Sequence, residues 1–410
     1  MPPSLKSQKR YTLLLLTAIF AVNSLDRQIL SILLDPIGRE FALSDTQLGL
    51  LSGLMFAVVF VLFGFPVAKL AARGNRRNIV SIAAMVWSSL TIVMAGAQNF
   101  TQLALARLGV GIGEAGCVAP AHSMISDLYP EERRTSAMST FVVGANLGIL
   151  FAFLIGGIAG QYLGWRWAFV IAGVPGLILA LLLRFTVQES VRDVSAPQSD
   201  RSLFLETFKY IWNDRGLFHA MIGLSIVGIF TFGTLAWNPT FIIRNHQLPL
   251  AQLGLFLALT IGVGGALGTW LSGQIADRLG DRDARWRIGI VIIAIIIPKP
   301  FGILYLFTET TQLALSFYVA GAVLAGVFWG PTFAYLHSRI PTHMRPMATA
   351  IFMFAFNLVG VGIGPTLIGL SSDMMFSDLG PQSLTYALLV VQISGIWAAW
   401  HYWQVVQEMK

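Results

Sequence analysis

Four charged residues lie within long apolar stretches of the sequence. Asp26 and Arg27 are adjacent inside the run 11–34, and Arg107 and Glu114 lie inside the run 100–128. Ionised side chains in such stretches are costly unless they pair or contact water, and they usually mark a pathway for an ion or a substrate. Their types indicate two kinds of chemistry, proton transfer on carboxylates and anion binding by arginines.

Helix geometry predicts how these groups lie relative to one another. At about 1.5 Å per residue, Asp26 is roughly 22 Å from the inner end of its run, and Arg107 is roughly 10 Å from the outer start of the other. Asp26 and Arg107 are therefore expected at a similar depth, close enough to pair. Glu114 shares a helix face with Arg107 but lies about 10 Å nearer the inner end.

We predict that Asp26 and Glu114 couple transport to protons, because burial disfavours a charged carboxylate while a neighbouring arginine favours it. Arg27 and Arg107, with Asn23 beside them, are predicted to bind an anionic headgroup, since guanidinium groups suit bidentate phosphate contact. The alternative is an inert buried network that locks the two helices together. A neutral pair of Asp26 with Arg107 would suffice for packing, which favours the functional hypothesis.

Twelve apolar runs must position these residues. Of the 410 residues, 55% are hydrophobic and 11% are charged, against about 25% charged residues in an average soluble domain. Each run approaches the ~20 residues with which a helix crosses the hydrocarbon core, so we predict an all-α membrane protein with twelve transmembrane helices. The runs are 11–34, 46–72, 78–97, 100–128, 134–161, 166–188, 216–244, 250–279, 286–307, 311–339, 344–373 and 382–407.

The formal net charge of +7 reflects membrane topology. Only Arg39, Arg166 and Arg244 fall in predicted outer loops, whereas most other Lys and Arg residues fall at inner ends. This asymmetry predicts that both termini are cytoplasmic. We expect an integral protein of a bacterial inner membrane, acting as a monomer, with the lipid bilayer and not nucleic acid as its partner.

The two halves of the chain repeat each other. "PEERRTSAMSTFVVGAN" after the fourth run aligns with "PTHMRPMATAIFMFAFN" after the tenth, which matches Arg134 with Arg345. This predicts two pseudo-symmetric six-helix bundles, 1–188 and 216–410, with the substrate between them at mid-depth. The linker 189–215 contains an apolar stripe that predicts a short helix. The stripe fits a helix on the inner membrane surface as well as one packed on the protein.

These motifs together resemble the major facilitator superfamily. "GQIADRLGDR" after the eighth run is similar to its signature loop, and "RLGVGIGEAG" to its fourth-helix arginine motif. "LDR" at 25–27, with Arg107 and Glu114, resembles the Spinster-like branch, whose animal members move lysolipids and sphingoid phosphates. The resemblance implies alternating access, with conformational roles for Arg73, Arg134, Asp277, Arg278 and Arg345. The first-half signature loop departs from the pattern at Ala68 and Ala72.

The cargo is predicted from a second group of residues, the aromatic side chains of the seventh and tenth runs. Phe230, Trp237, Phe328 and Trp329 would form an apolar wall opposite the arginines, although such residues often serve packing or face lipid. A charged wall and an aromatic wall suit an amphiphilic anion such as a lysophospholipid. A small organic anion such as a sugar acid, and drug efflux, are the alternatives.

No cofactor or metal is expected. "GIGEAG" at 111–116 matches a dinucleotide fingerprint, but that fingerprint requires a preceding strand and these glycines lie within an apolar run. The histidines show no metal-ligand spacing. No nucleophile with a base is apparent, so we expect a transporter and not an enzyme, with a non-transporting sensor as a minor alternative. The role of Lys299, inside the ninth run, is left open.

Overall fold

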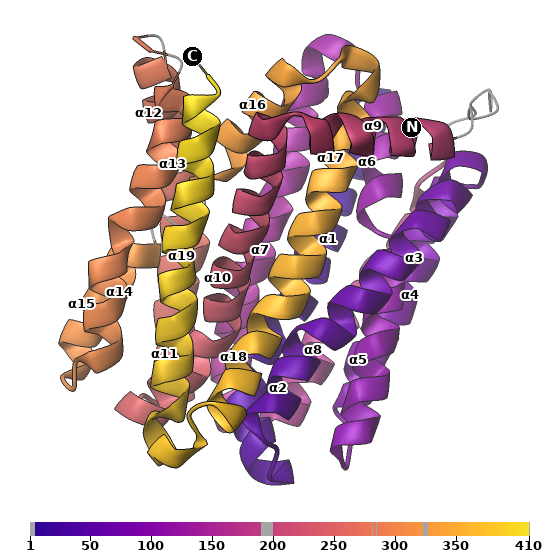
Figure 1. Ribbon diagram of the computed structural model, residues 1–410. Coiled ribbons are helices and arrows are strands. Elements are labelled where there is room, and N and C mark those ends of the chain that lie inside the picture. Colours follow the sequence, from indigo (N-terminus) through magenta and orange to yellow (C-terminus); the bar gives the residue numbers. More distant parts are fainter. Residues whose placement is uncertain (1–4, 190–199, 281, 284, 323–326, 410) are drawn as a thin grey trace. The chain divides into compact units, whose positions relative to one another are not determined.

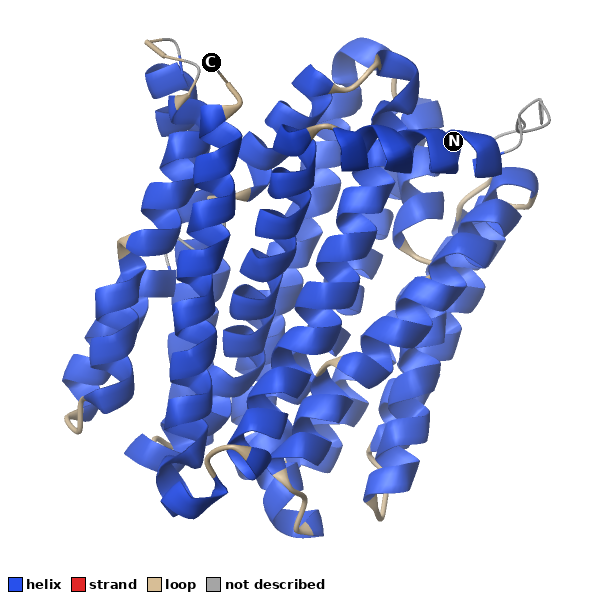
Figure 2. Cartoon of the chain, in the orientation of Figure 1, coloured by secondary structure: helices blue, strands red, loops and turns tan. Residues whose placement is uncertain are grey.

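The computed structural model describes residues 5–189, 200–280, 282–283, 285–322 and 327–409. These residues form helices joined by short connections, and the described part contains no strand (Figure 2). All twelve predicted runs are mostly helical where they are described, with short turns inside some of them, so the predicted twelve-helix, all-α fold is confirmed. Among the described residues, ten helical stretches are long and apolar enough to cross a membrane. The eighth run is divided by a π-helix, and residues 323–326 of the tenth run are outside the described residues.

The contacts divide the chain into two units, which are described separately. Unit 1 comprises Met1–Leu43, Met55–Ala196 and Leu248–Gly262, and unit 2 comprises Ser44–Leu54, Pro197–Gln247 and Val263–Lys410. Two short segments therefore belong to the unit of the other sequence half, because 45–52 packs on 364–374 and 250–257 packs on 131–162.

The helices of unit 1 are α1 (Leu5–Phe41), α3 (Leu54–Arg73), α4 (Arg76–Met94), α5 (Phe100–Glu114), α6 (Val118–Leu128), α7 (Glu131–Tyr162), α8 (Trp165–Thr186) and α11 (Leu250–Leu257), and η1 (Ala258–Gly264) follows α11. The helices of unit 2 are α2 (Asp45–Ser52), α9 (Asp200–Asn213), α10 (Arg215–His246), α12 (Gly265–Gly280), α13 (Trp286–Ile296), α14 (Pro298–Phe307), α15 (Thr311–Ala322), α16 (Trp329–Arg339), η2 (Thr342–Met344), α17 (Arg345–Ala355), η3 (Phe356–Ile363), α18 (Gly364–Met374), η4 (Ser377–Gln382) and α19 (Ser383–Gln407) (Figure 1).

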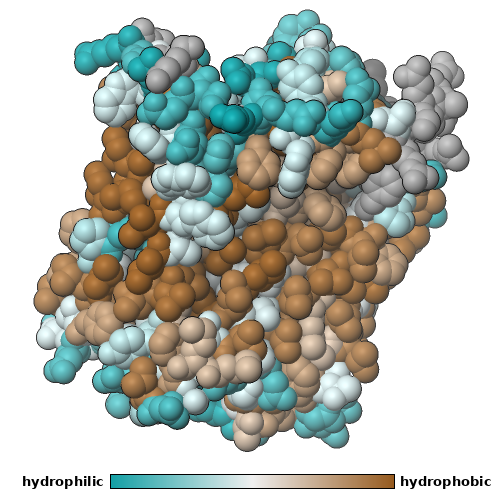
Figure 3. Space-filling model, in the orientation of Figure 1, coloured by the Kyte–Doolittle hydropathy of each residue, from teal (hydrophilic) through white to brown (hydrophobic). Residues whose placement is uncertain are grey.

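Hydropathy along the helices matches a membrane environment. The visible face is brown along the middle of the helices and teal towards their ends (Figure 3). Many large apolar side chains of the described residues are exposed, among them Leu105, Phe151 and Trp397. Exposed apolar side chains of this kind suit a lipid solvent, in which burying them gains little.

Local sequence decides where the second run breaks into two helices. The Ser44 side chain accepts a hydrogen bond from the amide of Gln47, and the Gln47 side chain accepts one from the amide of Ser44. This capping box begins α2. Gly53 ends the helix with a backbone conformation outside the helical region, after which α3 begins. The break allows α2 to pack on α18 while α3 packs in unit 1.

Small residues determine how closely α1 approaches α7, the most extensive helix contact of unit 1. A Cβ atom at Gly148 would collide with the carbonyl oxygen of Ala21 and lie 2.6 Å from the Cβ of Ser24. A Cβ at Gly144 would lie 2.5 Å from the carbonyl oxygen of Thr17. Close backbone approach through small residues is a typical way for membrane helices to associate.

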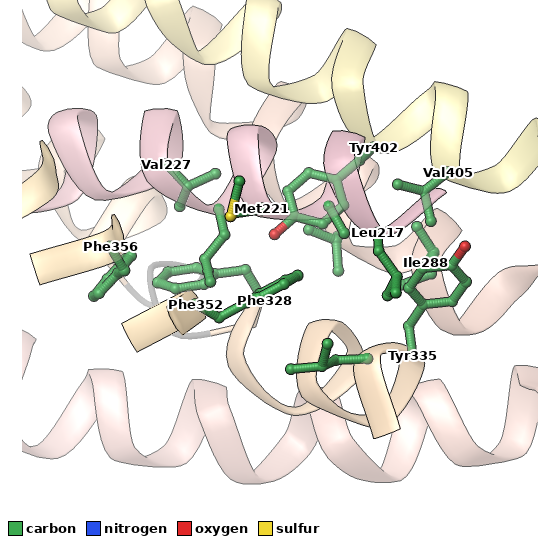
Figure 4. Packing of buried hydrophobic residues seen from close by; sticks show 14 of the residues in the cluster. Leu217, Met221, Val227, Ile288, Phe328, Tyr335, Phe352, Phe356, Tyr402 and Val405 are labelled. Atoms are coloured by element: carbon green, nitrogen blue, oxygen red, sulfur yellow. The ribbon is translucent and has the colours of Figure 1, made fainter. Parts of the chain in front are cut away.

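Unit 2 has a hydrophobic core between α10, α13, α16, α17 and α19. Leu217, Met221 and Val227 of α10 belong to this core together with Tyr402 of α19 and the aromatic rings of Phe328 and Phe352 (Figure 4). Buried apolar contacts of this kind hold the long helices of the unit together.

Gly148→Ala should destabilise unit 1, because the added methyl group has no space between α1 and α7. Overpacking of this kind typically costs about 1–3 kcal/mol. Gly64→Ala is the matched control, since nothing lies within 4 Å of the added Cβ and alanine is the better helix former by about 1 kcal/mol. Thermal unfolding of both variants in detergent measures the difference. Equal midpoints for the two variants would contradict the predicted close contact.

Candidate functional site

The four intramembrane ions lie together in unit 1, on α1 and α5. Asp26, Arg107 and Glu114 are buried, and Arg27 is partly buried with 23% of its side chain exposed. Asn23, one turn before Arg27 on α1, is fully buried. The structure thus places these five residues close together on α1 and α5, as the sequence predicts. Their roles in coupling and binding remain predictions.

The ion pairing differs from the expected pairing of Asp26 with Arg107. Arg27 Nε donates to Glu114 Oε2 at 2.5 Å. Arg107 Nη1 donates to the backbone carbonyl oxygen of Asp26 at 3.3 Å, and no ion pair of Arg107 occurs among the described residues. The expectation placed whole residues by their depth along a helix, but an arginine side chain is long enough to reach a different level from its own Cα atom.

The rings of Phe56 and Phe60 on α3 complete the cluster, and the sequence analysis missed both. Phe56 is buried, and its ring centroid lies 4.7 Å from Arg107 Cζ and 5.3 Å from Arg27 Cζ. Phe60 lies 4.5 Å from Arg27 Cζ. Cations are attracted to the face of an aromatic ring, so Phe56 allows two like charges to share one neighbour. An aromatic pair with i, i+4 spacing in an apolar run gives no separate sequence signal.

Several buried polar atoms of this cluster make no hydrogen bond to the described residues. They are Asn23 Nδ2 and Oδ1, Asp26 Oδ1 and Oδ2, Arg27 Nη2, Arg107 Nε and Glu114 Oε1. Thr91 lies near Asp26, and Asn23 lies near Glu114. Neither of these uncharged side chains forms a hydrogen bond of good geometry to the neighbouring acid. Buried polar groups are nearly always hydrogen-bonded. A cluster with this many donors and acceptors without partners is therefore suited to binding water or a polar ligand.

The predicted aromatic residues lie in unit 2 and are mostly packed. Trp237 is fully buried and donates from Nε1 to the carbonyl oxygen of Pro365 at 2.8 Å. Phe328 is buried, and its ring centroid lies 5.4 Å from that of Trp329 and 5.9 Å from that of Phe356. Trp329 is partly buried and stacks on Phe333 with ring centroids 5.7 Å apart. Trp237 and Phe328 therefore serve packing, while Trp329 keeps part of its surface exposed.

Phe230 contacts Lys299, whose role the sequence analysis left open. Lys299 is buried, and its Nζ lies 3.2 Å from the centroid of the Phe230 ring and 3.5 Å from Gln392 Oε1. A Cβ at Gly395 would lie 2.5 Å from this Nζ, so the glycine makes room for the ammonium group. Lys299 thus joins α14 to α10 and α19 inside unit 2.

The residues with predicted conformational roles are only partly described. The side chains of Arg73 and Asp277 are outside the described part of the structure. Arg134, Arg278 and Arg345 are exposed. Their roles in switching remain predictions.

Arg76 is a buried ion that the sequence analysis did not single out. It is 1% exposed, and it donates to Asp127 at 2.6 Å, to Glu189 at 2.8 Å and to Ser123 at 2.8 Å. It thereby ties the start of α4 to α6 and to the segment after α8. A signal was present, because Asp127 at the end of the fourth run and Glu189 directly after the sixth run lie at the same predicted end as Arg76.

Comparisons with known proteins give consistent matches over almost the whole chain. The family model described as Major Facilitator Superfamily matches residues 16–365. An MFS-type efflux pump of Mycolicibacterium smegmatis is 30% identical over 92% of this chain and 87% of its own length. Protein spinster homolog 1 of Xenopus tropicalis is 27% identical over 94% of this chain and 79% of its own length.

A solved structure has the same fold. It is described as a bacterial homolog to the human lysosomal transporter Spinster, in an inward-facing and unoccupied conformation. The TM-score is 0.88 with 26% identity, and the match covers 98% of both chains.

Arg76→Gln should destabilise unit 1 by about 3 kcal/mol, because it leaves the carboxylates of Asp127 and Glu189 without their buried cation. Arg134→Gln is the control, since this exposed side chain is expected to change stability by less than about 0.5 kcal/mol. The free energy of unfolding in mild detergent measures both. If Arg76→Gln lowers the free energy of unfolding no more than the control does, the contacts of Arg76 with Asp127 and Glu189 do not stabilise the fold.

Proposed function

This chain belongs to the major facilitator superfamily, and we propose that it is a proton-coupled secondary transporter of an amphiphilic anion such as a lysophospholipid. The family membership rests on the family model and on the relatives reported above. These relatives are transporters and not enzymes. Alternating access, two six-helix halves and both termini in the cytoplasm are part of the proposal.

The observation that carries the proposal is the number of buried polar atoms without hydrogen-bond partners around three buried ions and the partly buried Arg27. Two arginines and two acids give the cluster no formal net charge, yet five buried polar atoms of these four residues and both side-chain polar atoms of Asn23 lack a hydrogen-bond partner in the described residues. A network that served packing alone would cost stability with so many unpaired groups. An anionic headgroup offers acceptors for Arg27 Nη2 and Arg107 Nε at the same time, and phosphate oxygens suit this geometry.

The Arg27–Glu114 contact suggests how a proton and an anion are linked. While Glu114 is ionised, its carboxylate occupies Arg27 Nε at 2.5 Å. An anionic headgroup that takes over Arg27 leaves Glu114 without its counter-ion in a buried place, where a carboxyl group keeps its proton. Binding of the anion and uptake of a proton then favour each other. Asp26, whose carboxylate makes no hydrogen bond with good geometry, is the second candidate for carrying a proton.

Drug efflux is the second candidate function, and the efflux pump of Mycolicibacterium smegmatis favours it. The unpaired donors Arg27 Nη2 and Arg107 Nε favour an anion instead, because an anionic group offers them acceptors and a cationic dye does not. The similarity to spinster proteins and the partly exposed Trp329 favour an amphiphile over a sugar acid. A binding screen with lysophospholipids, sugar acids and cationic dyes separates the three.

Glu114→Gln should abolish proton-driven transport while retaining binding of a lysophospholipid. The amide cannot ionise, so it neither carries a proton nor competes for Arg27 as an anion. Uptake of fluorescent lysophosphatidylglycerol into proteoliposomes with and without a pH gradient measures coupling, and the same probe in detergent measures binding. Asp26→Asn is tested in parallel, with the exposed Glu131→Gln as the control. Gradient-dependent uptake that persists in both Asp26→Asn and Glu114→Gln would end the proposed coupling.

Phe56→Leu should weaken binding of the same anionic probe by about tenfold, equivalent to a cation–π contribution of about 1.4 kcal/mol. Without the ring, Arg27 and Arg107 lose the surface that holds them side by side. Phe63→Leu on the same helix is the matched control, because the ring of Phe63 is 40% exposed and contacts neither arginine. Equal affinity of the two variants for the probe would contradict a role for Phe56 in positioning.

A further inference from the structure

The helix α9 has one face packed on unit 2. Thr207 and Ile211 are buried, and Leu203 packs partly against the core. Tyr210 donates from its hydroxyl group to the carbonyl oxygen of Arg339 at 3.1 Å. These contacts fix α9 against α10 and α17. Of the two sequence interpretations of this helix, packing on the protein therefore describes one of its faces.

A second face of α9 exposes an aromatic ladder, defined as Phe204, Phe208 and Trp212. Their exposed fractions are 43%, 38% and 57%, and the neighbouring Leu205 is 58% exposed. The rings stack along the helix, with centroid distances of 6.2 Å between Phe204 and Phe208 and 5.8 Å between Phe208 and Trp212. Three stacked rings that each expose more than a third of their surface among the described residues are unusual on a surface that faces water only.

The remaining face of α9 is polar. At about 100° per residue, Glu206, Lys209 and Asn213 follow the aromatic ladder around the helix and lie away from the packed face. The helix thus presents three sectors in order, one towards the protein, one aromatic and one polar. A helix that lies in a membrane–water interface beside a protein needs these three sectors.

The aromatic ladder continues onto membrane-spanning helices. Trp212 contacts Phe218 of α10 edge to face at 5.0 Å, and Phe218 contacts His219 at 5.7 Å. His219 in turn contacts Trp400 of α19, whose exposed fraction is 47%. Since α10 and α19 are apolar enough to span the bilayer, this continuity places the ladder at the level where the spanning surface ends. Tryptophan and other aromatic rings concentrate at that level in membrane proteins.

The orientation of α9 is consistent with a position at the membrane–water interface. Within unit 2, α9 runs across the end of α10 rather than along it, and it lies at the same end as the C-terminus (Figure 1). A depression of about 280 Å³ lies between Phe208, Lys209 and Trp212. Two rings and a lysine side chain line it almost entirely with apolar atoms, and the apolar stem of a lysine can lie along an acyl chain while its charge stays in water.

We propose that the aromatic ladder of α9 is a docking surface for the bilayer leaflet at this end of unit 2, with the rings inserted below the headgroups and the polar sector in water. The occupant is lipid of the surrounding membrane, not transported cargo, so the proposal is independent of the function proposed above. Because α9 packs on α10 and α17, the contact fixes the depth of these two helices in the membrane.

Spin labels on single cysteines test the proposal in the full-length protein in phospholipid nanodiscs. The only native cysteine, Cys117, is fully buried, and unlabelled wild type checks that it does not react. Labels at Phe208→Cys and Trp212→Cys are expected to collide several-fold more with oxygen, which concentrates in lipid, than with a water-soluble nickel complex. Labels at the controls Glu206→Cys and Asn213→Cys should show the opposite preference.

Two results would overturn the proposal. A preference for the nickel complex at all four positions would place the ladder in water. Low collision with both reagents at positions 208 and 212 would show that protein, such as a second copy of the chain, covers the ladder. If Phe208→Cys does not fold, as judged by its elution profile, Leu205→Cys reports on the same sector.

Discussion

A charge inside hydrocarbon needs compensation, and unit 1 depends on how it meets this requirement. The contact between Arg27 and Glu114 at 2.5 Å compensates one cation and one acid. Phe56 adds its ring face to both arginines. This arrangement requires α1, α3 and α5 to approach closely, and Gly111 of α5 leaves the space that Phe56 and Val59 of α3 occupy. Helix packing and the ion cluster are therefore parts of one constraint.

The two arginine clusters of unit 1 show how differently buried charge is used. Arg76 is nearly inaccessible and has hydrogen-bond partners on three other groups, so it acts as a structural link. The cluster of Asp26, Arg27, Arg107 and Glu114 keeps several atoms without partners. A fully satisfied network rigidifies a protein, whereas a partly satisfied one retains the capacity to bind. This contrast, more than the presence of ions, distinguishes the proposed transport site from a packing device.

The aromatic residues of unit 2 likewise fall into a buried group and an exposed group. Trp237 and Phe328 fill the interior, although the sequence suggested that they line a wall for the cargo. Phe204, Phe208 and Trp212 stay exposed on α9, although their apolar stripe also predicted packing. Periodicity shows that one side of a helix is apolar, but it does not identify the solvent or protein that meets that side. Membrane proteins make this choice harder, because lipid and protein interior are both apolar.

The sequence by itself determined the twelve helical runs, the family resemblance and the gathering of Asp26, Arg27, Arg107 and Glu114, because run length and residue spacing depend on neighbours along the chain. Only the tertiary structure decided that Arg27 pairs with Glu114, that Phe56 lies beside both arginines and that Arg76 is buried. These contacts join residues far apart in sequence. They depend on helix rotation, on side-chain reach and on the break at Gly53, none of which a hydropathy pattern specifies.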